Sequence, residues 1–301
     1  MNIGSFLLGD RPLYGVFSGP SVTPACADFL ARYPTLRNVL DDDALALLQQ
    51  ESASNAPVPV SDITFLPPIP NPRKIICVGM NYRKPYPVDG VTPPDPDNIN
   101  LFGKEREAML AHGEALERPA GTAANSFDYE GEIAVVIGRT ARHVPFEDAM
   151  GYVLGYAAFN DGSVRDWQKH SVYAGKNFAR SGAWGPWITT ADALPPPQDL
   201  ELTVALNGEV VQQAFGREMV FSIAEQIAYA SHLFTLRPGD VIATGSPDGT
   251  GGSRNPKRYL TAGDIVEVSI GSAGTLVNSV CAGSERQCLA PNFSTSNFRF
   301  L

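Results

Sequence analysis

The stretch from Asp128 to Gly138 reads DYEGEIAVVIG and constrains the fold more than any other part of the chain. Val, Ile and Ala residues bounded by glycine are typical of a β-strand, in which side chains alternate between two faces. Glu130 and Glu132 are two positions apart and would share one face, and both faces become apolar after Glu132. The pattern predicts a strand that is buried at one end and carries two carboxylates at the other.

Two carboxylates on one face of a partly buried strand repel each other unless one is protonated or a cation bridges them. Oxygen ligands favour Mg²⁺, with Mn²⁺ or Ca²⁺ as alternatives, over zinc. Asp161 is a third candidate ligand, because the apolar run 152–159 predicts a strand that opens into a loop at NDGS. Taken singly, an ExE pair is more often a solvated strand face, and Asn-Asp-Gly is more often a turn.

Further motifs follow in a fixed order between about residues 70 and 280. They are KIICVGMNY at 74–82, DYEGEIAVVIG at 128–138, GYAAFNDGSVRDWQ at 155–168, GK at 175–176, GPW at 185–187, LRPGDVIATGSP at 236–247 and YLTAGDIVEV at 259–268. In this order they resemble the fumarylacetoacetate hydrolase family. The resemblance implies that the metal ligands are Glu130, Glu132 and Asp161.

The resemblance also implies roles for other polar residues. The catalytic residues would be Lys176, Arg165, Gln168, Ser246 and Lys104. The substrate-binding residues would be Tyr82, Arg83 and Gly245. Arginine suits a carboxylate and glutamine suits a carbonyl or enol oxygen. Offsets of four and seven residues from Asp161 would place Arg165 and Gln168 on one side of a helix.

The loop at 81–100 is where the chain departs from the family. Members that hydrolyse usually carry a histidine shortly after the Asn-Tyr pair, and Pro85 stands at that place. The loop is interpreted either as a lid over the metal or as a surface loop. Proline has no proton to exchange, so the group that would activate water is missing from this position.

Three functions follow from these motifs. The first is a divalent-metal-dependent hydrolase that cleaves a C–C bond in a β-dicarbonyl or acylpyruvate-type substrate through a metal-bound enolate. The alternative is a decarboxylase or keto–enol isomerase of a 2-oxo (β-keto) acid, since these reactions need mainly the metal. The third is a catalytically silent metal-binding relative.

Many short strands with Gly and Pro turns predict an α+β fold that is mainly β. The resemblance makes it a mixed β-sandwich roll with a small N-terminal α/β unit. The predicted units are 1–70, with a hairpin at 5–17 and a helix at 41–50, the catalytic domain at 71–281, and a tail at 282–301. A second hairpin is predicted at 202–213 around Asn207-Gly208, and a helix capped by Ser222 and Glu225 follows.

The formal net charge of −9 and the pI near 5.0 argue against nucleic acid or an anionic membrane as a partner. The four cysteines show no C-x-x-C spacing, and no apolar run approaches ~20 residues. We therefore expect a cytoplasmic enzyme that acts on a small oxo-acid or dicarbonyl. The resemblance adds a homodimer.

Overall fold

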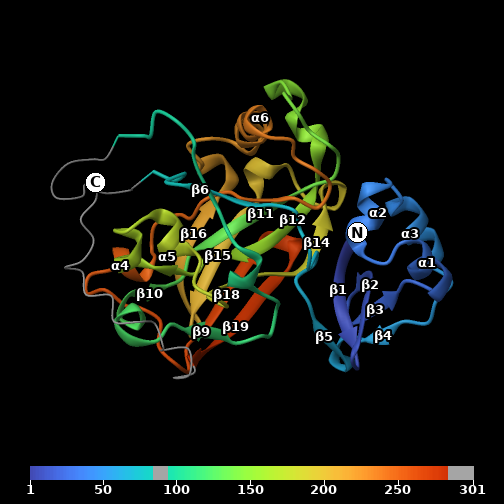
Figure 1. Cartoon of the computed structure of the whole chain (residues 1–301), viewed down its shortest axis with the longest axis horizontal. Helices are drawn as coiled ribbons and strands as arrows, with labels where there is room; N and C mark the ends of the chain where they lie inside the picture. The colour runs from blue at the N-terminus through green and yellow to red at the C-terminus, as the bar shows by residue number, and fades with distance from the viewer. Residues whose placement is uncertain (84–93, 284–301) are drawn as a thin grey trace, which may run out of the picture.

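The computed structural model describes residues 1–83 and 94–283, and strands dominate this part of the chain (Figure 1). The largest sheet has the order β4-β3-β2-β1-β14-β12-β11-β17-β6-β7, with β5 paired to β1 and β8 paired to β14. Its strands are β1 (Asn2–Leu8), β2 (Arg11–Ser18), β3 (Ser21–Pro24), β4 (Val58–Pro59), β5 (Ile63–Phe65), β6 (Ile75–Gly79), β7 (Asn100–Gly103), β8 (Met109–Leu110), β11 (Gly131–Ile137), β12 (Val153–Asn160), β14 (Gly182–Thr190) and β17 (Val241–Ala243).

A second sheet has the order β16-β15-β18-β19-β9, and a short pair joins β10 to β13. These strands are β9 (Leu116–Arg118), β10 (Phe127–Asp128), β13 (Ser163–Val164), β15 (Glu201–Leu206), β16 (Glu209–Phe215), β18 (Ile265–Ile270) and β19 (Thr275–Ala282). Parallel and antiparallel pairs both occur. The prediction of a mainly β fold with mixed sheets is confirmed.

Within residues 1–83 and 94–283, six α-helices lie around the sheets: α1 (Ala27–Arg32), α2 (Leu36–Asp41), α3 (Leu45–Ser52), α4 (Arg165–Gln168), α5 (Val172–Lys176) and α6 (Ile223–Leu233). In Figure 1, α1–α3 lie beside β1–β3 at one side of the molecule, and α4 and α5 lie at the other. A 3₁₀-helix, η4 (Phe146–Tyr152), precedes β12. None of the helices in the described part of the chain combines the length and the apolar character that crossing a membrane requires.

Both faces of β11 are buried, as its sequence predicts. Ile133 and Val135 pack into a core with Val204 and Val268 of the second sheet. The opposite face, which includes Ala134 and Val136, packs into a core that reaches the N-terminal helices. The strand that carries the carboxylates is therefore held from both sides.

The N-terminal strands extend the same large sheet, because β1 pairs with β14. The hairpin of β1 and β2 is confirmed. The division of the chain at about residue 70 remains a prediction. In the C-terminal tail, residues 284–301 lie outside the described residues, and so does Pro85 in the loop after Tyr82.

The predicted helix at 41–50 is wrong in its first half. Helix α2 ends at Asp41, and Asp43 adopts a positive φ of 53° before α3 begins at Leu45. The Asp43 and Ala44 amides donate back to carbonyls of α2. The acidic run thus forms the turn after one helix, because the chain must reverse to bury apolar residues of both helices.

Two further local predictions, the second hairpin and the capped helix, are confirmed. Strands β15 and β16 form the predicted hairpin, and Asn207 and Gly208 both have positive φ, as a two-residue turn of this kind requires. At the start of α6, the Ser222 side chain accepts from the Glu225 amide and the Glu225 carboxylate accepts from the Ser222 amide.

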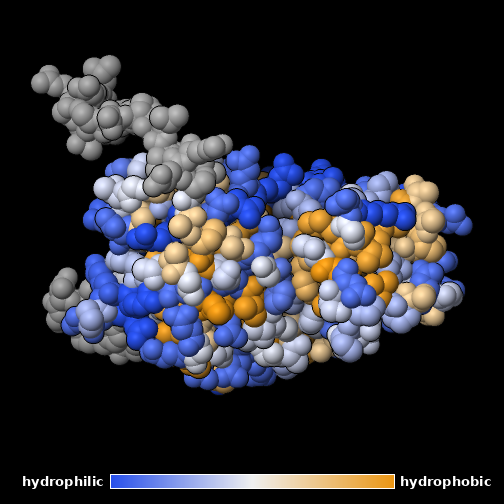
Figure 2. All heavy atoms as spheres, turned by 90° about the horizontal axis from the view of Figure 1, so that it is seen from below, coloured by the Kyte–Doolittle hydropathy of each residue, from blue (hydrophilic) through white to orange (hydrophobic). Residues whose placement is uncertain are grey.

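Figure 2 shows the surface seen from below in Figure 1, where apolar side chains gather in patches between hydrophilic ones.

Candidate metal centre

Strands β11 and β12 bring three carboxylates together. The two strands are antiparallel neighbours, and Gly131 lies opposite Asn160. Glu130, just before β11, therefore lies beside Asp161, just after β12. The Asp161 amide donates to the Glu130 carbonyl at 2.8 Å. Glu132 points to the same place, and one carboxylate oxygen from each of the three residues lies within 4.8 Å of the others. All three are buried.

Cationic side chains surround two of these carboxylates. Lys104 Nζ donates to Asp161 Oδ1 at 2.6 Å, and Lys176 Nζ donates to Asp161 Oδ2 at 2.6 Å. Lys176 also contacts Glu130, which forms a second ion pair with Arg165. Burial alone would raise the pKa of Glu130, but the charges of Arg165 and Lys176 outweigh it and hold the pKa below its usual value. Glu130 is therefore kept ionised.

Glu132 is the exception. Among the described residues its carboxylate has no ion pair, and it accepts the Gly245 amide at 3.0 Å. Burial, with the negative charge of Asp161 as the next cause, raises its pKa well above the usual value. Gly245 has a φ of +96°, and a Cβ there would lie 2.6 Å from Asn81 Cβ, so only glycine brings this amide to Glu132.

The donor set fits a divalent cation. Three buried carboxylates supply hard oxygen ligands and leave Glu132 without a counter-charge of its own. A cation held by all three would remove the repulsion between Glu132 and Asp161. The cluster could therefore hold a divalent metal ion.

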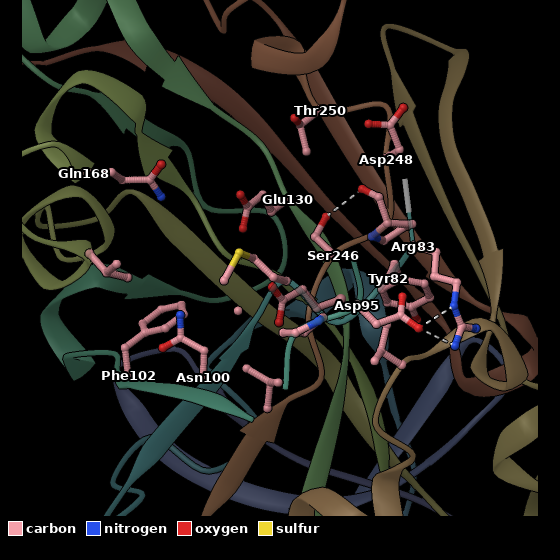
Figure 3. Close-up of a pocket in the computed structure, with 18 of the residues that line it drawn as sticks. Tyr82, Arg83, Asp95, Asn100, Phe102, Glu130, Gln168, Ser246, Asp248 and Thr250 are labelled. Atoms are coloured by element: carbon pink, nitrogen blue, oxygen red, sulfur yellow. Dashed lines mark hydrogen bonds and ion pairs between the residues drawn. The ribbon is translucent and has the colours of Figure 1, made fainter. Parts of the chain in front are cut away.

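A cavity of about 650 Å³ opens over the carboxylates (Figure 3). Its described lining includes six of the predicted site residues besides the metal ligands Glu130 and Glu132, together with other side chains. These six are Tyr82, Arg83, Arg165, Gln168, Lys176 and Ser246. Of the predicted residues outside this lining, Lys104 and Asp161 lie beneath the cavity as a buried ion pair, and Gly245 contacts Glu132.

Tyr82 and Arg83 lie near the start of the loop at 81–100, which was interpreted either as a lid or as a surface loop. The Tyr82 hydroxyl is buried and has no hydrogen-bond partner among the described residues. Burial, with the charge of Glu132 as a second cause, raises its pKa, so the hydroxyl stays protonated. Arg83 donates from Nε and Nη2 to Asp95 Oδ2 at 2.9 and 2.7 Å (Figure 3).

The helical spacing from Asp161 to Arg165 and Gln168 is wrong. Asp161 lies in a loop, β13 follows it, and α4 begins only at Arg165. Arg165 and Gln168 nevertheless both line the cavity. A short strand that pairs with β10 turns the chain, so α4 faces the carboxylates without sharing a helix with Asp161.

Several side chains that support the site received no role from the sequence. Asn160 Oδ1 accepts the Glu130 amide at 3.1 Å, and Asn81 Nδ2 donates to the Thr244 carbonyl at 2.7 Å. Gln212 donates to Ser246 Oγ at 2.8 Å and accepts the Gly131 amide at 3.0 Å. Asp128 binds Arg165 at 2.8 Å. Asn81, Asp128 and Asn160 lie inside the sequence motifs, and this position was the one indication in the sequence that they support the site.

Known proteins are similar to this chain in both sequence and fold. The family model described as fumarylacetoacetate (FAA) hydrolase C-terminal matches residues 74–281. The mitochondrial oxaloacetate tautomerase Fahd2a of Rattus norvegicus is 34% identical over 265 residues, which cover 87% of this chain and 81% of the relative.

Two solved structures are similar over most of their length. A fumarylacetoacetate hydrolase from psychrophilic Exiguobacterium antarcticum superposes with a TM-score of 0.82 at 30% identity, covering 94% of this chain and 99% of that chain. The maleylpyruvate hydrolase of Sphingobium sp. SYK-6, in complex with manganese(II) and pyruvate, has a TM-score of 0.78 at 28% identity, covering 94% and 100%.

Proposed function

This chain belongs to the fumarylacetoacetate hydrolase family, and on that premise we propose that it is a divalent-metal-dependent keto–enol tautomerase of a small 2-oxo acid such as oxaloacetate. The observation that carries the proposal is the intact carboxylate cluster beneath a cavity lined by Arg165 and Lys176. The similarity to an oxaloacetate tautomerase supports the same reaction. C–C hydrolysis, which the sequence motifs put first, becomes the second candidate reaction.

Glu130, Glu132 and Asp161 would hold the metal, and we propose Mg²⁺, with Mn²⁺ or Ca²⁺ as alternatives. When bound, such an ion would supply Lewis-acid chemistry that stabilises negative charge on the oxygens of a 2-oxo acid. The manganese(II) complex of a similar hydrolase supports a divalent ion at this place. The donor set itself consists of oxygen atoms, as Mg²⁺ and Mn²⁺ prefer.

The cationic side chains would stabilise the charge that develops during tautomerisation. Lys176 lies between Glu130 and Asp161 and lines the cavity, so its ammonium would stand beside an enolate oxygen. Arg165 Nη2 has no hydrogen-bond partner among the described residues, which leaves a donor for a substrate carboxylate. Gln168 lines the same cavity and could donate to a carbonyl or enol oxygen.

Tautomerisation moves one proton between carbon and oxygen, whereas hydrolysis also requires an activated water. No histidine occurs among the described residues that line the cavity. The Tyr82 hydroxyl is buried there, and its raised pKa makes it a donor rather than a base. These groups support proton exchange on a bound oxo acid better than the deprotonation of water.

The test compares three reactions of the purified protein with Mg²⁺: enol-to-keto conversion of oxaloacetate, decarboxylation of oxaloacetate and hydrolysis of an acylpyruvate. We expect the first to be fastest and to disappear when the metal is chelated. Faster acylpyruvate hydrolysis would return C–C cleavage to first place. Absence of all three reactions, with metal bound, would favour a silent metal-binding relative. The homodimer and the cytoplasmic location remain predictions.

A further inference from the structure

Asp128 lies behind two walls of the cavity without reaching it. It ends β10, its exposed fraction is 0%, and it is absent from the described lining. A fully buried carboxylate needs strong partners, because burial of an uncompensated charge is costly. The proposed reaction does not use Asp128 directly, so the burial of its carboxylate calls for a separate reason.

The carboxylate of Asp128 accepts four hydrogen bonds. Oδ1 accepts the Tyr129 amide at 3.0 Å and the Gly251 amide at 2.8 Å. Oδ2 accepts the Gly252 amide at 2.8 Å and Arg165 Nε at 2.8 Å. All four partners are donors, so only a group that accepts with both oxygens can satisfy them. An asparagine would turn an NH₂ group towards two of these donors.

The partners of Asp128 belong to two separate walls. Arg165 opens α4 and lines the cavity. The glycine-rich loop after β17 forms the other wall, where Ser246, Asp248 and Thr250 line the cavity immediately before Gly251. One buried carboxylate therefore joins an element at residue 165 to a loop at residue 251, although the loop is 123 positions away from Asp128.

The close approach at Gly252 reinforces this connection. A Cβ at this position would lie 3.2 Å from Asp128 Oδ2 and 3.4 Å from Arg165 Nε. Such contacts are tight enough to require the neighbours to shift. The absence of a side chain at Gly252 lets loop, carboxylate and guanidinium meet at a single point.

We propose that Asp128 is a positioning residue that sets the orientation of the Arg165 guanidinium and the place of the 248–252 loop wall relative to the substrate. Arginine has a long side chain with considerable rotamer freedom, and fixing its fork in advance lowers the cost of binding a carboxylate. Glu130 also holds Arg165, but Glu130 would be shared with the metal. Asp128 is the anchor that lies outside the carboxylate cluster.

The role assigned to Arg165 rests on the proposed function, and a double-mutant cycle tests that part. Asp128→Asn should lower kcat/KM for oxaloacetate by about 10- to 100-fold, the range for loss of a charge-assisted hydrogen bond. In the Arg165→Gln background the same substitution should change kcat/KM less than about 3-fold, since the guanidinium through which Asp128 would act on the substrate carboxylate is gone. Equal losses in both backgrounds would overturn positioning through Arg165.

The exposed Asp166→Asn is the matched control, because Asp166 lies next to Arg165 on α4 but pairs with Lys169 at the surface. It should leave kcat/KM within about 2-fold of wild type.

A second measurement needs neither substrate nor metal. In the wild-type protein, the Gly251 and Gly252 amides and the Arg165 Nε–H should exchange slowly with solvent hydrogen. Asp128→Asn should speed exchange of at least one amide and of Nε–H by about 10-fold or more, and Asp166→Asn should not. Unchanged exchange in Asp128→Asn overturns the proposal. If wild type shows no oxo-acid tautomerase activity, the proposed function fails, while exchange still decides the role of Asp128.

Gly252→Ala provides an independent route if Asp128→Asn fails to fold. It keeps all charges and presses a methyl group on the point where Asp128 and Arg165 meet. We expect an increase of KM for oxaloacetate of about 3- to 10-fold, in the range of a small steric displacement of a binding group. The substitution should have no further effect in the Arg165→Gln background. A kcat/KM equal to that of wild type would overturn the link between loop and arginine.

Discussion

Buried carboxylates stand at both ends of the strand pair β11–β17, and their surroundings differ. Asp240, just before β17, is 0% exposed and accepts the Lys74 amide, Lys74 Nζ and the Arg237 amide at 2.9–3.0 Å. Glu132, on β11 at the other end, is 1% exposed and receives one amide from Gly245. The hydrogen-bonding capacity and charge of Asp240 are satisfied by other groups of the protein, whereas Glu132 has no cation paired with it among the described residues.

Asp264 repeats the arrangement of Asp240 at the start of β18. Its carboxylate accepts from Thr261, Asn207 and Arg258, and the Thr261 amide stands three residues before it, as the Arg237 amide stands before Asp240. Both acids close a Gly-Asp turn into a strand. Native proteins satisfy nearly all buried polar groups, and exceptions gather where function requires them. The comparison therefore separates carboxylates that stabilise the fold from carboxylates available to a cation.

Glu132→Ala should have the largest effect. Removing one ligand from the cluster should lower turnover by more than about 1,000-fold, beyond the 10- to 100-fold typical of residues that only support a ligand. The fold should remain, since Glu132 has few partners to lose. Metal content by elemental analysis and turnover with Mg²⁺ check this. Retained metal and activity would remove Glu132 from the cluster.

Asp240→Ala should have the reverse profile. It leaves two partly buried amides and the Lys74 ammonium without the carboxylate that accepts from them, so we expect a loss of about 2–3 kcal/mol in the free energy of unfolding. Denaturant unfolding measures this, and KM for oxaloacetate at a temperature where the variant is folded should be unchanged. If Asp240→Ala lost metal binding without losing stability, the distinction between a structural role for Asp240 and a metal-binding role for Glu132 would be wrong.

Arg165→Lys tests whether the shape of the guanidinium at the cavity, and not only its charge, matters for catalysis. Lysine keeps the positive charge but loses the planar fork that reaches Asp128, Glu130 and a ligand together. We expect kcat/KM to fall by the equivalent of roughly 1–3 kcal/mol. An unchanged kcat/KM would mean that the guanidinium does not contact the substrate.

Glu132→Gln sharpens the comparison with a smaller effect of opposite sign. In the metal-free protein it removes a buried charge that Asp161 repels, so the free energy of unfolding should rise by about 1 kcal/mol. Thermal unfolding in the presence of a chelator measures it. A destabilised variant would show that the protein already compensates the charge of Glu132.

Asp264→Asn should show an effect on stability of similar size at pH 7, with a characteristic pH dependence. Burial tends to raise the pKa of Asp264, but hydrogen bonds from Arg258, Asn207 and Thr261 outweigh it and lower the pKa to about 2. A lowered pKa means that the ionised form stabilises the fold above about pH 4 and that this stability is lost as pH falls towards 2. The variant should be about 1 kcal/mol less stable at pH 7, and the difference should vanish near pH 2. A difference that persists there would contradict an ionic origin.

The sequence by itself determined the elements whose signals are local. The alternation in β11, the Asn207-Gly208 hairpin and the capping box at Ser222 depend on neighbouring residues, and each was predicted correctly. The acidic run at 41–43 was misread, because the choice between helix and turn there depends on which apolar residues are buried against distant strands.

Only the tertiary structure decided which groups meet at the site. Lys104 and Asp161 are 57 positions apart, Gly245 lies 113 positions from Glu132, and the loop at Gly251 lies 123 positions from Asp128. Most of these residues lie in or near the sequence motifs, but no local sequence pattern predicts which of them are in contact. Strand register and close packing set those distances, and they leave Glu132 short of charge while Asp128 is fully bonded.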